Sequence, residues 1–303
     1  MFIKKYFYKI TNKEKYYSYK VQHLEEKKIK IFKERVEEKI KNTQNSIKNK
    51  KEISFLHSGH LGDIINSLPV IKELSKTHKC NLYIESNRPI PNNIKFNQHP
   101  SGQVFLNNKN INMLIPLLKE QPYIQNVNEY NNESIDIDFN LFRELPINFN
   151  LDSVRWYFHI SGVHADLSNP YLFVEQNNSF KEKVIIIRSL RRKNYLINYN
   201  FLKDYKNLLF IGLSNEYNDL KKEVPNLEFY DCKDFLEMAQ IIQSSKFFLG
   251  NLSLGYTLAE GLKIPRLLEA CPDFPLVYPN GKNAYDFYFQ KHFEKFFNVL
   301  YKQ

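Results

Sequence analysis

Two polar loops, each expected to follow a buried strand, hold most of the side chains that could do chemistry. The first contains Gly59, His60, Gly62 and Asp63, directly after the apolar run 53–57. Apolar residues then recur at the spacing of one helix face, so this loop leads into a helix. Backbone N–H groups and the helix dipole can bind a polar ligand at such a point. Asp63 can either cap that helix or act as a general base for a hydroxyl group.

The second loop is basic and follows the first strand expected in the C-terminal half, at 183–189. It brings four cationic side chains together: Arg188, Arg191, Arg192 and Lys193. Cations at the carboxyl end of a parallel strand suit a phosphate or a diphosphate. The alternative is a basic turn that serves only solvation.

A third segment, 250–262, combines the end of a strand, a turn and the start of a helix. Ser253 can cap this helix while its free N–H groups bind an anion, and Gly255 permits a close approach of a ligand. We expect five residues here to contact the ligand: Asn251, Ser253, Leu254, Gly255 and Tyr256.

Three carboxylates are placed near the same strand ends. Glu260 lies about two turns into the helix of 250–262, and Glu269 follows the next strand. Either can accept hydrogen bonds from ribose hydroxyls, as acids do in dinucleotide-binding folds, although Glu260 can equally be an exposed helix residue. Glu216 opens a helix after a strand, where capping competes with ligand binding.

The elements that position these residues alternate as strand and helix, which predicts an α/β protein with parallel sheets. We expect a basic helical extension and linker at 1–51 and two Rossmann-like domains at 52–165 and 166–282. A terminal helix over 283–303 can pack back on the first domain. The two domains are expected to face each other across a cleft, with ligands beyond the carboxyl ends of the strands.

Charge separates the extension from the rest of the chain. Residues 1–51 hold 16 Lys and Arg against 6 Asp and Glu, which accounts for the whole net charge of +10. A neutral body argues against a nucleic-acid enzyme. The helical pattern between Val21 and Ile40 is either a solvated helix packed on the body, or a short coiled coil, or a basic helix at an anionic membrane surface.

Three dispersed cysteines without a C-x-x-C pair predict neither a disulfide framework nor a zinc site, and they favour a reducing compartment. The N-terminal residues lack an apolar core of signal-peptide length, and no segment has the length and apolarity of a membrane span. We therefore expect a cytoplasmic protein, with peripheral contact at the inner face of the membrane as the role of residues 1–51.

Four segments resemble a family of two-domain GT-B glycosyltransferases, family 9, which includes the ADP-heptose–lipopolysaccharide heptosyltransferases. They are GHLGDIINSLPVIKEL (59–74), IIIRSLRRKN (185–194), FIGLSNEYNDL (210–220) and GNLSLGYTLAEGLKIP (250–265). The resemblance covers about residues 52–300 and leaves the extension outside. The pattern G-D-x-x-x-x-L-P is its most specific part.

The resemblance implies roles for matching positions. Asp63, in the G-D pair with Gly62, would be the general base that activates the acceptor hydroxyl. Arg191, Arg192 or Lys193 would contact the donor phosphates, and Glu216 would be the family's acid after the second strand of that domain.

The family's diphosphate loop, G-x-D-[ST]-G-x-x-H, aligns here with a departure. Its fixed positions fall on Gly250, Leu252, Ser253, Leu254 and Thr257, so the Asp, the second Gly and the His are absent. Asn251 and Gly255 can compensate by one-residue shifts. This departure bears on whether the donor is ADP-heptose, and it leaves the expectation of a nucleotide-sugar donor unchanged.

These patterns predict a metal-independent glycosyltransferase that needs no cofactor and takes a nucleotide sugar as co-substrate. Its partners would be that donor and a glycan or glycolipid acceptor, in cell-surface glycan or lipopolysaccharide-type assembly, with no nucleic acid. Two alternatives stay open: a nucleotide-sugar epimerase or hydrolase on the same fold, and a non-catalytic relative that binds a sugar nucleotide.

Overall fold

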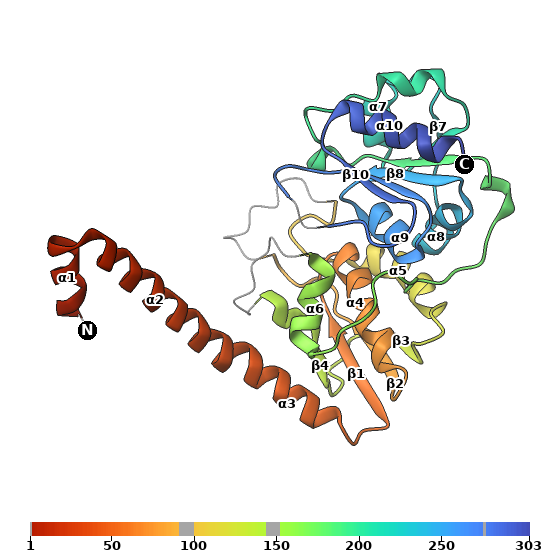
Figure 1. The fold of residues 1–303 in the computed structure, drawn as a ribbon. Helices are drawn as coiled ribbons and strands as arrows, with labels where there is room; N and C mark the ends of the chain where they lie inside the picture. The colour runs from red at the N-terminus through yellow and green to blue at the C-terminus, as the bar shows by residue number, and fades with distance from the viewer. Residues whose placement is uncertain (1, 91–99, 144–151, 275–276) are drawn as a thin grey trace.

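The computed structural model describes residues 2–90, 100–143, 152–274 and 277–303. They form two parallel sheets, each in its own lobe, and a helical arm that projects from the N-terminal lobe (Figure 1). Both predicted α/β domains are therefore present. None of the described helices combines the length and the apolarity needed to cross a membrane.

The N-terminal lobe is built on a sheet with the strand order β3-β2-β1-β4. Its elements are β1 (Glu52–His57), α4 (Leu61–Leu74), β2 (Lys79–Ile84), α5 (Asn108–Lys119), β3 (Asn126–Glu129), β4 (Ile137–Asp138), the 3-10 turn η2 (Phe139–Arg143) and α6 (Ser153–Ser161). Strand β1 is central and pairs in parallel with both β2 and β4. The loop after β1 therefore leaves from the middle of the sheet.

The C-terminal lobe has the strand order β10-β9-β8-β5-β6-β7. Its elements are η3 (Asn178–Phe180), β5 (Val184–Ile187), η4 (Leu190–Arg192), η5 (Asn200–Asp204), β6 (Leu208–Ile211), α7 (Ser214–Leu220), β7 (Glu228–Tyr230), α8 (Phe235–Ser244), β8 (Phe247–Asn251), α9 (Leu254–Leu262), β9 (Arg266–Glu269), β10 (Ala284–Phe287) and α10 (Gln290–Tyr301). Strands β5 and β8 are neighbours at the centre of this sheet. The basic loop and the start of α9 therefore lie side by side.

The end of the chain differs from the expected single helix. Residues 284–287 form β10, which extends the C-terminal sheet in parallel beside β9, and only then does α10 begin. Phe293 and Phe297 on α10 are fully buried in one core with the C-terminal strands. The expectation that this helix packs on the N-terminal domain is wrong, because its aromatic stripe covers the C-terminal sheet.

The two lobes share an apolar core. Helix α4 packs against α9 and α5 packs against α8, so helices from both lobes meet between the sheets. The buried aliphatic and aromatic residues of these four helices belong to one cluster that also includes residues from the strands of both sheets. This packing brings the N-terminus of α4 close to the N-terminus of α9.

The arm consists of α1 (Phe2–Thr11), α2 (Lys13–Phe32), the π-helical segment η1 (Lys33–Glu37) and α3 (Glu38–Ile47). Its C-terminal end packs on the body: Val36 and Ile47 are buried, and the Gln44 side chain donates a hydrogen bond to the Gly162 carbonyl, 3.1 Å away. A helix packed on the body by one face is therefore the correct description of this end. Helix α2 has no buried residue.

Candidate active site

The loop after β1 faces the start of α9 from the opposite lobe. A Cβ atom added to Gly62 would lie 3.3 Å from Oγ1 of Thr257, a contact tighter than most side chains make. Two segments almost 200 positions apart in the chain thus meet at the ends of two helices. The sequence predicted that these two segments would face each other across a cleft, and in the structure Gly62 and Thr257 lie close together.

Asp63 lies in the first turn of α4 and is partly accessible, with 20% of its side chain exposed. Its Oδ2 accepts a hydrogen bond from the His60 backbone N–H at 3.1 Å and lies 3.7 Å from Nη2 of Arg143. Burial raises the pKa of the carboxyl group, while the charge of Arg143 and the His60 amide oppose that rise. Asp63 therefore caps its helix, and both of these contacts use one carboxylate oxygen.

Arg143 is a site residue that the sequence reasoning missed. Its guanidinium group lies over two aromatic rings, 4.1 Å from the centre of Phe105 and 4.2 Å from that of Phe142. Cation–π contacts on two rings hold the group in place beside Asp63. The only sequence signal was its position just after the short strand β4, within η2.

The two histidines of the loop are held as neutral rings. The Gly59 backbone N–H donates to Nδ1 of His57 at 2.9 Å, so Nε2 of that ring carries the proton and donates to the Tyr157 hydroxyl at 3.0 Å. His60 donates from Nδ1 to the Phe105 carbonyl at 3.0 Å, and burial is the main reason that its pKa falls to about 4. Burial also lowers the pKa of His57.

Gly59 is needed because the loop is crowded rather than because a ligand approaches it. An added Cβ would lie 2.6 Å from the His57 ring and 3.0 Å from Oδ2 of Asp63. A side chain here would displace the carboxylate. Gly59 thus positions Asp63 by leaving room for it.

A second cation on the N-terminal side, Arg88, also escaped the sequence reasoning. Its Nη1 donates to the Ser58 hydroxyl at 2.9 Å, and Ser58 donates in turn to Oδ1 of Asn140 from both its N–H and its hydroxyl. The charge of Arg88 helps to lower the pKa of His57. Arg88 and Arg143 therefore place positive charge on the N-terminal side of the loop.

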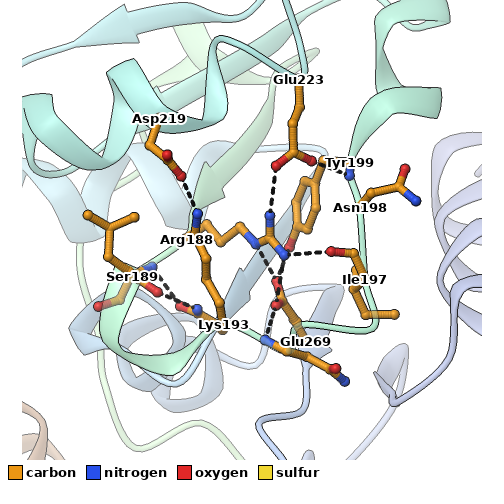
Figure 2. Close-up of polar contacts among 12 residues, drawn as sticks. Arg188, Ser189, Lys193, Ile197, Asn198, Tyr199, Asp219, Glu223 and Glu269 are labelled. Carbon is orange, nitrogen blue, oxygen red and sulfur yellow. Dashed lines mark hydrogen bonds and ion pairs between the residues drawn. The ribbon is translucent and has the colours of Figure 1, made fainter.

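Arg188 does not have the surroundings expected of a phosphate ligand. It is buried, and its Nε and Nη2 donate to the two carboxylate oxygens of Glu269 at 2.8 and 3.1 Å (Figure 2). Nη2 also donates to the Ile197 carbonyl, and the guanidinium group lies 4.2 Å from the centre of the Tyr199 ring. Glu223 contributes a second carboxylate at 3.5 Å.

Glu269 is fully buried in the same cluster. Besides Arg188, it accepts hydrogen bonds from the Asn194 backbone N–H at 2.6 Å and from the Tyr199 hydroxyl at 2.8 Å. Glu269 therefore lies inside the lobe and uses its oxygens for internal hydrogen bonds. We expected it to accept hydrogen bonds from ribose hydroxyls, but in the structure it is the ion-pair partner of Arg188. We assign both residues to the support of the basic loop.

The other three cations of that loop are half-buried. Lys193 forms an ion pair with Asp219 (Figure 2), and the Arg192 guanidinium group lies 3.5 Å from the centre of the Phe274 ring. Burial lowers the pKa values of Arg191 and Arg192. The charges of these two arginines also help to lower the pKa of His60 across the lobes.

Glu216, on α7, stabilises the basic loop by a hydrogen bond to its backbone. Its carboxylate accepts a hydrogen bond from the Leu190 backbone N–H at 3.3 Å. Burial raises the pKa of Glu216, and hydrogen bonds from Ser189 and Leu190, with the charges of Arg191 and Lys193, oppose the rise. Glu216 thus shapes the loop that carries the cations.

The start of α9 divides into an accessible part and an internal part. Ser253 is partly accessible and caps the helix: its hydroxyl accepts from the Tyr256 N–H at 3.5 Å and donates to the Asn251 carbonyl at 3.0 Å. The Asn251 side chain is fully buried, and it accepts from the Ser189 N–H and donates to the Ser189 carbonyl, both at 2.8 Å. Asn251 therefore joins the ends of β8 and β5, and Leu254 is partly buried against the core.

Three further candidates are internal and do not have the expected access to a ligand. A Cβ on Gly255 would lie 2.2 Å from Cδ1 of Ile187, so this glycine allows α9 to pack on β5. Tyr256 is fully buried. Glu260 is buried and accepts from Nε of Arg266 at 2.6 Å and from Lys263. Their predicted contacts with a donor are replaced by contacts within the lobe.

The site candidates that remain partly accessible come from both lobes. Asp63 lies on the N-terminal side with Arg88 and Arg143, while the His60 ring is largely buried. On the C-terminal side they are Arg191, Arg192, Lys193 and Ser253. The described residues contain no group of three His, Cys, Asp or Glu side chains placed to hold a metal ion.

Comparisons with known proteins agree with this architecture. No protein-family model matches the chain, and no curated protein matches it by sequence. Among solved structures, E. coli ADP-heptose lipopolysaccharide heptosyltransferase II is similar over 83% of this chain and 99% of its own, with 12% identity and a TM-score of 0.52. At that identity the likeness concerns the fold, and it shows that this chain has the GT-B fold.

Two further structures match at lower TM-scores. A family 9 glycosyl transferase from Veillonella parvula has 13% identity and a TM-score of 0.49, covering 78% of this chain and 86% of its own. E. coli heptosyltransferase WaaC with ADP-2-deoxy-2-fluoro heptose has 11% identity and a TM-score of 0.47, covering 82% and 99%.

Proposed function

We propose that this chain is a glycosyltransferase that moves a sugar from a nucleotide-sugar donor to an acceptor hydroxyl. The observation that carries the proposal is the meeting of the β1 loop with the start of α9, which come from separate lobes. The β1 loop supplies a partly accessible carboxylate, Asp63. The basic loop, which lies beside the start of α9, supplies two half-buried cations, Arg191 and Arg192, whose charges act on His60 of the β1 loop. The GT-B fold supports the proposal at the level of architecture.

In the proposed reaction the Asp63 carboxylate takes the proton of the acceptor hydroxyl. The acceptor oxygen then forms a bond to the anomeric carbon of the donor sugar. The bond between that carbon and the diphosphate oxygen breaks, and the nucleoside diphosphate leaves with the electron pair. Arg191 and Arg192 stabilise the negative charge that develops on the diphosphate, a role for which fixed cations are suited. The proposal therefore includes metal independence.

The donor site that we propose is smaller than the one expected from the sequence. Arg191, Arg192 and the N-terminus of α9 at Ser253 would contact the diphosphate directly. Lys193 and Glu216 would support the basic loop through Asp219 and Leu190. Gly62 would let the β1 loop approach the start of α9 closely, because a side chain there would meet Thr257.

Family 9 membership, a role in lipopolysaccharide-type or other cell-surface glycan assembly, and a glycan or glycolipid acceptor are further parts of the proposal. They rest on the four motifs and on the fold. We also propose a cytoplasmic location, with residues 1–51 making peripheral contact with an anionic membrane.

The test begins with a thermal-shift screen of UDP-, GDP-, ADP- and CMP-sugars, because a ligand that binds only the folded state raises the melting temperature. Turnover of the best donor is then compared between the wild type, Asp63→Asn and the control Glu73→Gln. Glu73 is also on α4, where it pairs with Lys76 at the far end of the helix. We expect loss of transfer in Asp63→Asn alone.

Three results would contradict the proposal. Unchanged turnover in Asp63→Asn would remove Asp63 as the base. Release of free or isomerised sugar without an acceptor would indicate a hydrolase or an epimerase. Nucleotide binding without any turnover, across a panel of acceptors, would indicate a non-catalytic sugar-nucleotide-binding protein.

A further inference from the structure

Helix α1 carries an exposed apolar face at the far end of the arm. Tyr6, Phe7 and Ile10 lie on one side of the helix at the spacing i, i+1, i+4, and they are 57%, 60% and 84% exposed. Lys5 and Lys9 lie on the other side of the helix, by the same geometry, and are exposed. A helix with one apolar and one basic side is suited to lie in the plane of a membrane interface.

The apolar face is not the surface that attaches α1 to α2. Tyr8, outside that face, approaches Tyr19 of α2 with ring centres 6.4 Å apart. Asn12 then begins α2 by accepting a hydrogen bond from the Lys15 N–H at 2.9 Å. The two helices thus form a capped helical hairpin that leaves Phe7 and Ile10 uncovered.

The arm also keeps α1 away from the lobes (Figure 1). The 20, 5 and 10 residues of α2, η1 and α3 span about 50 Å at a rise of 1.5 Å per residue. Among the described side chains of the arm, those that are buried against the body, Val36 and Ile47, lie near its C-terminal end. In the part of the chain that the structure describes, the lobes therefore do not cover α1.

The positive charge around α1 favours an anionic partner for its exposed apolar face. Residues 1–20 contain six lysines, one glutamate and seven aromatic residues. A second copy of the arm would bring the same positive charge against the first, which is unfavourable. An anionic lipid surface attracts the lysines, while aromatic side chains favour the headgroup level of a bilayer.

We propose that α1 is the element that binds the anionic bilayer and that α2 is a solvated strut between the bilayer and the lobes. The inference rests on the membrane contact proposed for residues 1–51 and is independent of the transfer reaction. It differs from the sequence interpretation, which placed the membrane-binding pattern between Val21 and Ile40. Part of that segment packs on the body instead.

The test measures co-sedimentation of the full chain with vesicles of phosphatidylcholine and phosphatidylglycerol, and with vesicles of phosphatidylcholine alone. The variant Phe7→Glu/Ile10→Glu is compared with Val21→Glu/Leu24→Glu on α2. Both pairs are exposed, share the i, i+3 spacing and receive the same added charge. We expect the α1 pair to weaken binding to the mixed vesicles by roughly tenfold or more, about 1.4 kcal/mol, and the α2 pair to retain most of the binding.

Equal weakening by the two pairs would overturn the proposal, because net charge would then explain the effect. Failure of the wild type to bind the mixed vesicles would also overturn it. So would a dimer in sedimentation equilibrium that Phe7→Glu/Ile10→Glu dissociates, since a second copy would then be the occupant. Nucleotide thermal shifts on the same variants separate this outcome from failure of the proposed transfer reaction.

Discussion

Replacing Arg188 with methionine tests whether this cation supports the fold or contacts the donor. The substitution keeps an unbranched apolar side chain in place of the aliphatic part of arginine and removes the guanidinium group. Glu269, fully buried, then loses its hydrogen bonds from Nε and Nη2 of Arg188, and the Ile197 carbonyl loses its donor. Among the described residues, the Asn194 amide and the Tyr199 hydroxyl continue to donate to Glu269.

The expected cost follows from this burial. Removal of one partner from a buried ion pair destabilises a protein by about 3–5 kcal/mol. This is a large fraction of the roughly 5–15 kcal/mol that keeps a typical protein folded. For a unit of about 150–250 residues it lowers the melting temperature by roughly 6–20 °C.

Urea unfolding followed by far-ultraviolet circular dichroism measures this cost, with Arg191→Met as the matched control. Arg191 follows the same strand but is half-buried, so its loss should change the unfolding free energy by less than about 0.5 kcal/mol. Arg191→Met should instead reduce the rise in melting temperature that the nucleotide produces.

A double variant sharpens the test. Arg188→Met/Glu269→Leu removes the isolated charge, and part of the lost stability should return. The recovery is partial because Asn194 and Tyr199 then lose their acceptor. If Arg188→Met instead kept the wild-type unfolding free energy and lost nucleotide binding, Arg188 would face the donor, and the reasoning from burial would be refuted.

Three further outcomes follow from the site. Asp63→Asn should abolish transfer while lowering the unfolding free energy by about 1 kcal/mol or less, the worth of a capping carboxylate; urea unfolding checks this, and a larger loss would indicate a structural role. Gly255→Ala should destabilise the C-terminal lobe by about 1–3 kcal/mol, because the new methyl group meets Cδ1 of Ile187 at 2.2 Å; Ile187→Val removes that atom and should restore part of the stability in the double variant. The unfolding free energy should fall as the pH decreases from about 6.5 toward about 4. Burial lowers the pKa of His60 to about 4 in the folded protein. Between these two pH values the unfolded chain binds more protons than the folded protein, so acid favours unfolding. His60→Gln should flatten this dependence relative to the wild type, and an unchanged pH profile would contradict the burial of the ring.

The strands and turns that position the site could be predicted because their signals are local. Apolar runs bounded by glycine, asparagine or charged residues marked β1, β5 and β8, and the spacing of apolar residues marked α4 and α9. Strand β10 was missed because AYDF adjoins an aromatic segment with helical spacing, so 283–303 was interpreted as one helix. Asn283, in a left-handed conformation with φ of 51°, separates this strand from the chain before it.

The roles of charged residues were harder to predict because their partners are distant in sequence. Arg188 and Arg191 are three positions apart in one loop, yet Arg188 is paired with Glu269, 81 positions away. Glu260 similarly accepts a hydrogen bond from Arg266, the first residue of the next strand. A usable signal was present: these charges lie within or directly beside elements that are otherwise apolar, where an ionised group needs an internal partner.

The charges that remain accessible explain why an anion is the expected ligand. Both histidines of the β1 loop are neutral at pH 7, because burial lowers their pKa values. Arg88 and Arg143 on one side and Arg191 and Arg192 on the other therefore dominate the charge around that loop. Of these cations, Arg143 is the one that forms an ion pair with Asp63 among the described residues. Burial lowers the pKa values of both Arg191 and Arg192, which means that their charged forms are incompletely solvated. An anion that reached them would offset this cost, and a diphosphate can contact both arginines at once. The charge of Arg143 and the His60 amide oppose the effect of burial on the pKa of Asp63 and so favour its ionised form, which the proposed proton transfer requires. Activation of the acceptor would therefore depend on a cation of the N-terminal lobe, and binding of the donor would depend on the cations of the C-terminal lobe.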